Sequence, residues 1–263
     1  MRTFVITGAS SGIGEALAYT YADRGDNVVI AARSEDELAR VASECERRGG
    51  KALAVRTDVT DPEQCKALVE RTIDRFGKLD VLVNNAGISM WARFDEVTDL
   101  TLFDRIMRVN YLGSVYCTHY ALPHLLASRG QLVAISSLTG KTGVPTRTAY
   151  AASKHAMQGF FDSLRVELLG TGVDVLVVSP GFVKTGIRDR VLGGDGKSRE
   201  VSPRDEDKGT MSTEECNRII VRAIDRRQRD VVMTARAKVG MWIKLIAPGF
   251  VDRIALRAVR EKA

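Results

Sequence analysis

Short apolar runs alternate along this chain with longer segments of helical period, an arrangement that few folds accommodate. Seven runs are rich in Val, Ile, Leu and Ala, at 4–6, 28–30, 52–55, 81–83, 132–135, 173–178 and 231–233. Continuous apolar runs of this length are typical of parallel strands that are buried on both faces. Helical patterns lie between them at 12–24, 35–48, 61–76, 99–127 and 149–169. The alternation predicts an α/β, Rossmann-like doubly wound fold: a mostly parallel seven-stranded sheet with helices on both faces.

The length and the apolar content indicate one large core. A chain of 263 residues with 44% hydrophobic residues is long enough for a single domain of this class. We expect that domain to cover 1–237, followed by a C-terminal extension over 238–263. The segment 186–211 carries five glycines and a dense mixture of charges, without a regular period. A stretch of that length is expected to be either a lid over a ligand site or a surface loop.

The net charge of +6 is unevenly distributed. Residues 218–263 hold 12 Lys plus Arg and 4 Asp plus Glu, whereas residues 1–217 hold 27 and 29. A basic groove across the fold, and hence a nucleic-acid partner, is not expected. The four cysteines and three histidines show no metal-ligand or redox spacing, and no secretory signal precedes the first strand. We therefore expect no metal site and a cytoplasmic location.

A glycine-rich turn follows the first predicted strand and runs directly into a helix. Glycine allows a tight turn and a close approach to a pyrophosphate, while the helix N-terminus stabilises negative charge. The turn predicts a dinucleotide site that includes Gly8, Ser10, Ser11, Gly12, Ile13 and Gly14.

The end of the second predicted strand indicates which dinucleotide is bound. Folds specific for NAD place an acid there, about 20 residues after the turn. This chain has Arg33 and Ser34 instead. A guanidinium pairs bidentately with a 2′-phosphate, so NADP(H) is favoured as the cofactor. After the third strand, Asp58 and Val59 suit the adenine edge.

A tyrosine and a lysine lie four residues apart on a segment of helical period. Tyr150 and Lys154 are therefore expected on one helix face. A free phenol has a pKa near 10, and a neighbouring ammonium favours the phenolate that acid/base chemistry needs. Ser137, 13 residues before Tyr150 at the end of a predicted strand, is placed to hydrogen-bond a carbonyl.

These features together resemble the short-chain dehydrogenase/reductase family of the single-domain kind. The resemblance covers about residues 1–235 and includes Thr7-Gly8-x-x-x-Gly12-Ile13-Gly14, Asn84-Asn85-Ala86-Gly87, Asn110, Ser137, Tyr150-x-x-x-Lys154 and Pro180-Gly181-x-x-x-Thr185. The block from Tyr150 to Phe161 is also similar to the hydroxysteroid-dehydrogenase-like branch and its membrane-associated relatives, which reduce lipid ketones.

The resemblance implies a role for each matching residue. Tyr150 would protonate the carbonyl as hydride arrives, Ser137 would hold the carbonyl oxygen, and Lys154 would lower the Tyr150 pKa and bind ribose. Asn110 would steady a water in the proton relay. The family also implies cofactor contacts at Asn84, Ala86, Gly87, Pro180, Gly181, Val183 and Thr185. It further implies a homodimer or homotetramer.

The expected substrate is a lipophilic ketone or secondary alcohol, steroid-like or lipid. Mostly apolar loop residues should surround the nicotinamide, namely Ser89, Met90, Trp91, Leu138, Val144 and Phe182. Core packing of these residues is the alternative. A 3-oxoacyl thioester reductase of the same family and a non-catalytic dinucleotide sensor are competing functions.

The C-terminal extension has an amphipathic pattern. Apolar residues recur at helical spacing at Val239, Trp242, Ile243 and Ile246, and a second stripe beyond Pro248-Gly249 faces away from several arginines. The segment is too short and too charged to span a bilayer. It is expected either to lie in a membrane interface with Trp242 and Phe250 inserted, or to pack on the domain or on a second subunit.

Overall fold

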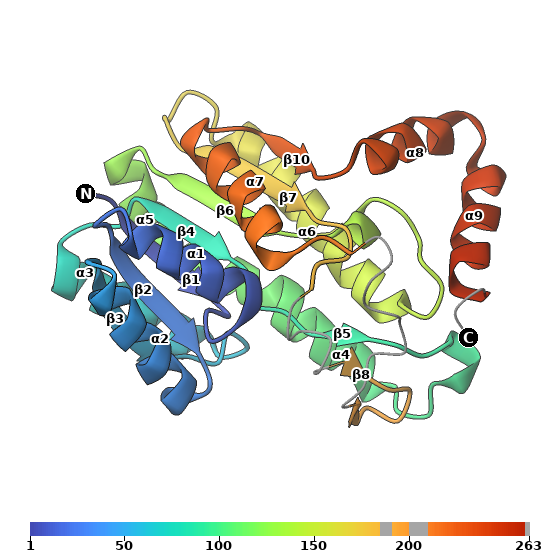
Figure 1. The fold of residues 1–263 in the computed structure, drawn as a ribbon, viewed down its shortest axis with the longest axis horizontal. Helices are drawn as coiled ribbons and strands as arrows, with labels where there is room; N and C mark the ends of the chain where they lie inside the picture. Colours follow the sequence, from blue (N-terminus) through green and yellow to red (C-terminus); the bar gives the residue numbers. More distant parts are fainter. Residues whose placement is uncertain (185–190, 200–209, 261–263) are drawn as a thin grey trace.

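The computed structural model describes residues 1–184, 191–199 and 210–260 (Figure 1). Its strands are β1 (Thr3–Thr7), β2 (Asn27–Ala32), β3 (Lys51–Arg56), β4 (Val81–Asn84), β5 (Ser89–Met90), β6 (Gln131–Ile135), β7 (Asp174–Ser179), β8 (Val191–Leu192), β9 (Ser198–Arg199) and β10 (Asp230–Val232). Its α-helices are α1 (Gly12–Ala22), α2 (Glu35–Arg47), α3 (Pro62–Phe76), α4 (Thr101–Met107), α5 (Gly113–Ser128), α6 (Thr148–Glu167), α7 (Thr213–Asp225), α8 (Ala235–Ile246) and α9 (Pro248–Arg260). Short turns of other helical types are η1 (Phe94–Glu96), η2 (Arg108–Leu112) and η3 (Leu138–Gly140).

Seven strands form one sheet in the order β10-β7-β6-β4-β1-β2-β3, and every neighbouring pair is parallel. All seven predicted apolar runs fall in this sheet, so the predicted doubly wound fold is confirmed. The strand order reverses at β1. This strand pairs with β2 on one side, and with β4 on the other side. In open parallel sheets, ligands bind outside the carboxyl ends of the strands at such a switch point.

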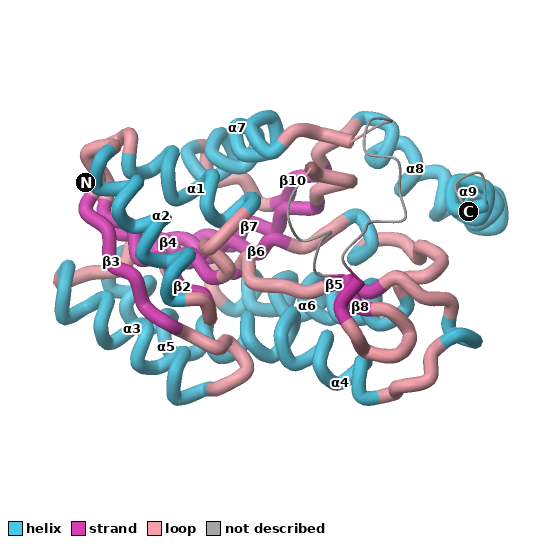
Figure 2. The backbone as a smooth tube through the Cα atoms, turned by 60° about the horizontal axis from the view of Figure 1, so that its bottom comes forward, coloured by secondary structure: helices cyan, strands magenta, loops and turns pink. Residues whose placement is uncertain are grey.

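Helices cover both faces of the sheet (Figure 2). Successive strand residues point to opposite faces, so Phe4 and Ile6 pack with α1, α2 and α7, whereas Val5 packs with α3, α5 and α6. Burial on both faces explains why the strands are continuously apolar. The two cores hold the carboxyl edge of the sheet rigid where the site lies.

The predicted helix over 99–127 is interrupted. It begins at Thr101, widens into the π-helical turn η2 over Arg108–Leu112, and continues as α5. A π-helical turn inserts an extra residue and redirects side chains, and it is often found at functional sites. Here the turn carries Asn110, which is fully buried.

Part of the segment 186–211 has regular structure, so the expectation that the whole segment lacks it is wrong for 191–199. There β8 pairs with β5 in parallel and with β9 antiparallel. The turn is attached to the domain because the Thr98 amide donates to the Gly194 carbonyl at 2.9 Å. The Arg105 guanidinium likewise donates to the Gly196 carbonyl at 2.9 Å. Positions 186–190 and 200–209 lie outside the described residues.

The tail formed by α8 and α9 projects from one end of the molecule (Figure 1). Helix α8 contacts β10 and α9. A hydrogen bond of 3.0 Å from the Lys244 ammonium to the Lys141 carbonyl joins the tail to the domain. Among the residues that the structure describes, no helix is both long enough and apolar enough to cross a bilayer.

Candidate active site

A cavity of about 930 Å³ opens at the carboxyl edge of the sheet. It extends from the glycine-rich turn and the end of β2, past the ends of β4 and β6, to the loop after β7 and the small sheet of β5 and β8. Its wall is therefore built from segments that are far apart in the sequence. A single elongated cavity of this kind can hold a dinucleotide beside a second ligand.

The glycine-rich turn has the backbone that a close ligand approach requires. Gly8 and Gly12 have positive φ values of 64° and 62°, a conformation that other residues adopt only with strain. A Cβ atom on Gly14 would lie 2.6 Å from the Gly8 carbonyl oxygen, so Gly14 lets α1 pack against the turn. Gly14 does not line the cavity, whereas Gly8, Ser10, Ser11, Gly12 and Ile13 do. The Ser11 hydroxyl does not cap α1.

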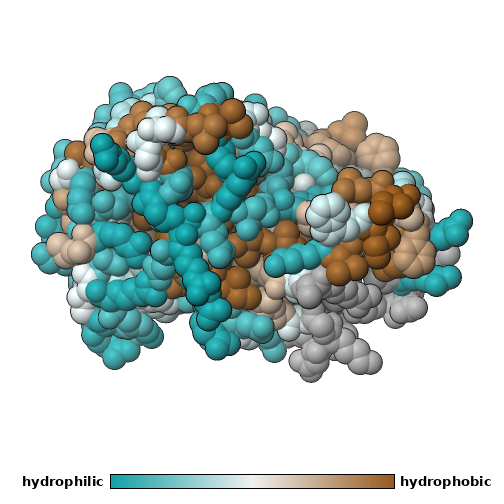
Figure 3. Space-filling model, turned by 90° about the horizontal axis from the view of Figure 1, so that it is seen from above, coloured by the Kyte–Doolittle hydropathy of each residue, from teal (hydrophilic) through white to brown (hydrophobic). Residues whose placement is uncertain are grey.

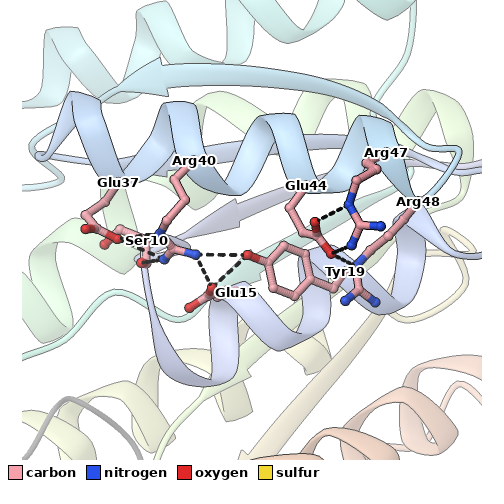
Figure 4. Close-up of polar contacts among 8 residues, drawn as sticks. All are labelled: Ser10, Glu15, Tyr19, Glu37, Arg40, Glu44, Arg47 and Arg48. Carbon is pink, nitrogen blue, oxygen red and sulfur yellow. Dashed lines mark hydrogen bonds and ion pairs between the residues drawn. The ribbon is translucent and has the colours of Figure 1, made fainter.

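A charged network that the sequence reasoning missed supports this turn from α2 (Figure 4). The Arg40 guanidinium donates to the Ser10 carbonyl at 3.3 Å and to the carboxylates of Glu15 at 2.7 Å and Glu37 at 2.8 Å. The network joins the turn, α1 and α2. Spacing alone gives no sign of it, because Arg40 lies 25 residues from Glu15.

The end of β2 presents Arg33 and Ser34 to the cavity wall. Arg33 is exposed, and the Ser34 hydroxyl does not cap α2 although Ser34 occupies the N-cap position. Asp58 and Val59 also line the cavity. One Asp58 carboxylate oxygen accepts from the Thr60 amide at 2.9 Å and from the Thr60 hydroxyl at 2.8 Å, which fixes this turn.

Tyr150, Lys154 and Ser137 lie together in the cavity wall. The Lys154 ammonium is 5.8 Å from the centre of the Tyr150 ring and donates to the Ile135 carbonyl at 2.8 Å. Burial lowers the pKa of Lys154 to about 7. Burial also raises the pKa of Tyr150, whereas a hydrogen bond with Ser137 and the charge of Arg147 lower it. The predicted helix face therefore presents both groups beside the end of β6.

Asn110 is close to this group but does not line the cavity. Its amide oxygen accepts from the Ile88 amide at 2.9 Å, and its amide nitrogen donates to the Ile88 carbonyl at 3.0 Å and to the Ser153 hydroxyl at 2.9 Å. These bonds join the π-helical turn to the chain after β4 and to α6. The structure thus gives Asn110 bonds that hold the backbone beside Gly87.

The expected cofactor contact at Asn84 is not at the cavity wall. Asn84 is buried, and its amide donates to the Thr118 hydroxyl at 3.0 Å. The next residue, Asn85, lines the cavity and donates to the carbonyls of Thr7 at 2.9 Å and Gly8 at 3.0 Å. Alternation along β4 directs the two amides to opposite sides, and the sequence motif does not show which one faces the ligand. Ala86 and Gly87 line the cavity.

The remaining predicted contacts divide in the same way. Pro180, Gly181 and Val183 line the cavity, and so do Ser89, Trp91, Leu138, Val144 and Phe182. Met90 does not, because it is fully buried in a separate core cluster between β5 and α6. Thr185 lies outside the described residues. Sequence reasoning missed Arg147 and the β8 residues Val191 and Leu192 in this wall.

Fold and site together define a class of protein, the α/β oxidoreductases that bind a nicotinamide dinucleotide at the switch point of a parallel sheet. The family model for short chain dehydrogenases matches residues 2–193, and this chain belongs to the short-chain dehydrogenase/reductase family. It is 40% identical over 256 residues to 11-beta-hydroxysteroid dehydrogenase A of Sesamum indicum, over 94% of this chain and 72% of that protein.

Two solved structures share the fold. A short-chain dehydrogenase/reductase of Burkholderia phymatum in complex with NAD has a TM-score of 0.83 and 26% identity, covering 95% of this chain and 94% of that chain. An alcohol dehydrogenase from the archaeon Thermococcus sibiricus, complexed with 5-hydroxy-NADP, has a TM-score of 0.75 and 26% identity, covering 88% and 95%. The similarity thus extends to proteins with either kind of dinucleotide.

Proposed function

We propose that this chain interconverts a carbonyl and a secondary alcohol on a lipophilic, steroid-like or lipid substrate, with NADP(H) as cofactor. The observation that carries the proposal is the meeting of Tyr150, Lys154 and Ser137 in one cavity with the glycine-rich turn. The apolar wall beside Tyr150, which includes Trp91 and Leu138, supports a lipophilic substrate. The steroid dehydrogenase named among its relatives supports the same class.

The residues at the other end of the cavity fit NADP(H). The uncapped N-terminus of α1 and the turn at Gly8 and Gly12 provide the backbone N–H groups that a pyrophosphate needs. Arg33, exposed in the cavity wall, would pair with a 2′-phosphate, and Ser34 would add a hydroxyl. When bound, the cofactor would donate a hydride to the carbonyl carbon in reduction and would accept one from the alcohol carbon in oxidation.

The side chains of the site would then manage the proton. In reduction, the Tyr150 hydroxyl donates its proton to the carbonyl oxygen, and the Ser137 hydroxyl hydrogen-bonds the same oxygen. In oxidation, the Tyr150 phenolate accepts the proton of the alcohol. Lys154, fixed by the Ile135 carbonyl, lies on the same face of α6 and favours the phenolate while it is protonated.

A substrate screen tests the function. NADPH oxidation would be followed with steroid ketones, long-chain aliphatic ketones and 3-oxoacyl thioesters, with Tyr150→Phe as the inactive control. We expect turnover of the steroid or aliphatic ketones. Preference for the thioesters would instead assign the competing reductase function. Tight NADPH binding without turnover of any carbonyl class would assign a sensing role.

For the tail we propose a peripheral contact with an anionic membrane surface. Large apolar side chains on α8 and α9 are exposed, among them Trp242 at 71% and Ile246 at 87%. Apolar surface gathers at this end of the molecule (Figure 3). Exposed cations accompany it at Lys238, Arg253 and Arg257, and Asp252 is the single acid within the described part of these helices. Apolar side chains flanked by cations suit an interface of acyl chains and anionic headgroups.

A further inference from the structure

Arg147 lies in the substrate end of the cavity, three residues before Tyr150. Its guanidinium carbon is 4.5 Å from the ring centre of Trp91 and 5.9 Å from that of Tyr150. Its Nη1 atom donates to the Ser89 hydroxyl at 2.7 Å. The guanidinium is therefore held between the small sheet and α6, within 6 Å of the Tyr150 ring centre.

The backbone directs this side chain into the cavity. Thr146 has a φ of +69°, a left-handed conformation that is costly for a β-branched residue. The Thr146 carbonyl accepts from the Ala92 amide at 3.0 Å, and the Arg147 carbonyl accepts from the Ala151 amide at 2.7 Å. The strained turn thus joins β5 to the start of α6. It places Arg147 at the N-cap of the helix that carries Tyr150.

The two cations near Tyr150 differ in how they respond to pH. Burial lowers the pKa of Lys154 to about 7, so its ammonium loses its proton as the pH rises through neutrality. A guanidinium stays protonated over the whole range in which proteins are stable. The charge of Arg147 also lowers the pKa of Tyr150 against the effect of burial.

In the described part of the cavity wall, the other charged groups have partners or places of their own. The described charged residues of the wall are Arg33, Asp58, Arg105, Arg108, Arg147 and Lys154. Arg33 and Asp58 lie at the ends of β2 and β3, at the adenosine end. Arg105 donates to the Gly196 carbonyl, and Arg108 pairs with Asp104 at 2.7 Å. Among these described groups, the single carboxyl therefore lies away from Tyr150.

We propose that Arg147 is a positioning residue that supplies a permanent positive charge to the Tyr150 ring and so favours its phenolate. The inference rests on the proposed function, in which Tyr150 is the acid/base. It adds to that function a second cation, from outside the Tyr-x-x-x-Lys pair, that keeps its charge when Lys154 does not. The consequence is a site whose phenolate forms at a lower pH than burial alone would allow.

A tyrosinate difference titration of the purified, ligand-free protein tests the proposal without any substrate. Subtracting the ultraviolet titration of Tyr150→Phe from that of the wild type isolates Tyr150. The same subtraction for Arg147→Gln uses Arg147→Gln/Tyr150→Phe. We expect the midpoint of the Tyr150 titration to rise by about one pH unit in Arg147→Gln, since a unit charge some 6 Å from the ring centre is removed. Arg147→Lys, which keeps a charge, should restore most of the shift.

The controls separate charge from packing. Arg105→Gln removes a different arginine from the same cavity and should leave the midpoint unchanged. Trp91→Leu removes the stacking partner of the guanidinium and should give a smaller upward shift, which provides a second test if Arg147→Gln folds poorly. An unmoved midpoint in Arg147→Gln and Trp91→Leu, or an equal shift in Arg147→Lys and Arg147→Gln, would overturn the proposal.

Kinetics then connect the titration to turnover. With the ketone found in the substrate screen, Arg147→Gln should retain reduction to higher pH and should need higher pH for oxidation, because reduction uses the phenol and oxidation the phenolate. Full activity of Tyr150→Phe would contradict the proposed function. The titration result would still decide whether Arg147 acts on the phenol, so the two failures are distinguishable.

Discussion

The catalytic domain and the tail use apolar residues in opposite ways. In the domain, Phe161 on α6 is fully buried between the helix and the sheet, and its position fixes the helix that carries Tyr150. In the tail, Trp242 on α8 is 71% exposed. Burying a large apolar side chain gains hydrophobic free energy and stabilises one arrangement of its neighbours. An exposed apolar side chain can gain that free energy only when another surface covers it. The domain thus covers its large apolar side chains, whereas the tail leaves several of them exposed.

Among changes in the domain, replacing Tyr150 by Phe should have the largest effect on turnover. Removing the hydroxyl leaves the ring in place but removes the proton donor, so we expect kcat to fall by about a thousandfold or more. NADPH binding, measured by fluorescence titration, should change little. Tyr116→Phe on α5, outside the cavity, is the matched control. Retained turnover in Tyr150→Phe would contradict the mechanism.

Replacing one glycine in each region by alanine compares how tightly the domain and the tail are packed. A Cβ atom at Gly14 would lie 2.6 Å from the Gly8 carbonyl, whereas at Gly240 in α8 nothing lies within 4 Å. Gly14→Ala should lower the free energy of unfolding by about 2–3 kcal/mol because the turn and α1 are forced apart. Gly240→Ala should be neutral or stabilising by up to about 1 kcal/mol. Urea denaturation measures both, and equal effects would remove the contrast.

In the proposed function, Arg33 would select NADPH over NADH. Arg33→Ala should weaken NADPH binding by about 10- to 100-fold, the amount expected for a lost charge-assisted pair, and NADH binding much less. Isothermal titration with both dinucleotides gives the ratio. Arg47→Ala is the control, because Arg47 lies in the last turn of α2 and pairs with Glu44 at 2.7 Å. Equal losses for the two dinucleotides would exclude Arg33 from the phosphate site.

Changes in the tail should leave turnover almost unchanged. Trp242→Ser/Ile246→Ser should reduce flotation of the protein with vesicles of anionic phospholipid, because the exposed apolar side chains are lost. Leu169→Ser, which removes a side chain that is 75% exposed on the domain, should float like the wild type. Flotation that persists in the double variant, or a change from dimer to monomer without any lipid effect, would assign the tail to another surface.

The sequence predicts the catalytic domain well because its elements are local. Strands buried on both faces and helices with a regular period leave a pattern in consecutive residues, and Tyr150 and Lys154 share a face by spacing alone. Asn84 and Asn85 show where this stops. Asn84 ends β4 and Asn85 follows it, and the alternation of the backbone decides which of the two side chains faces the cavity. The role of Asn110 likewise depends on a π-helical turn that the helical period conceals.

What the sequence alone determined is the order of strands and helices, the family resemblance, and the concentration of positive charge in the last 46 residues. The tertiary structure decided which side chains share the cavity. Arg147 reaches Trp91 and Tyr150 through a strained turn, and β8 covers the same wall from a segment that has no period in the sequence. It also left the tail exposed. The contact of Arg147 with Trp91 and the pairing of β5 with β8 join residues that are distant in the sequence, and the local pattern of a sequence does not encode such contacts.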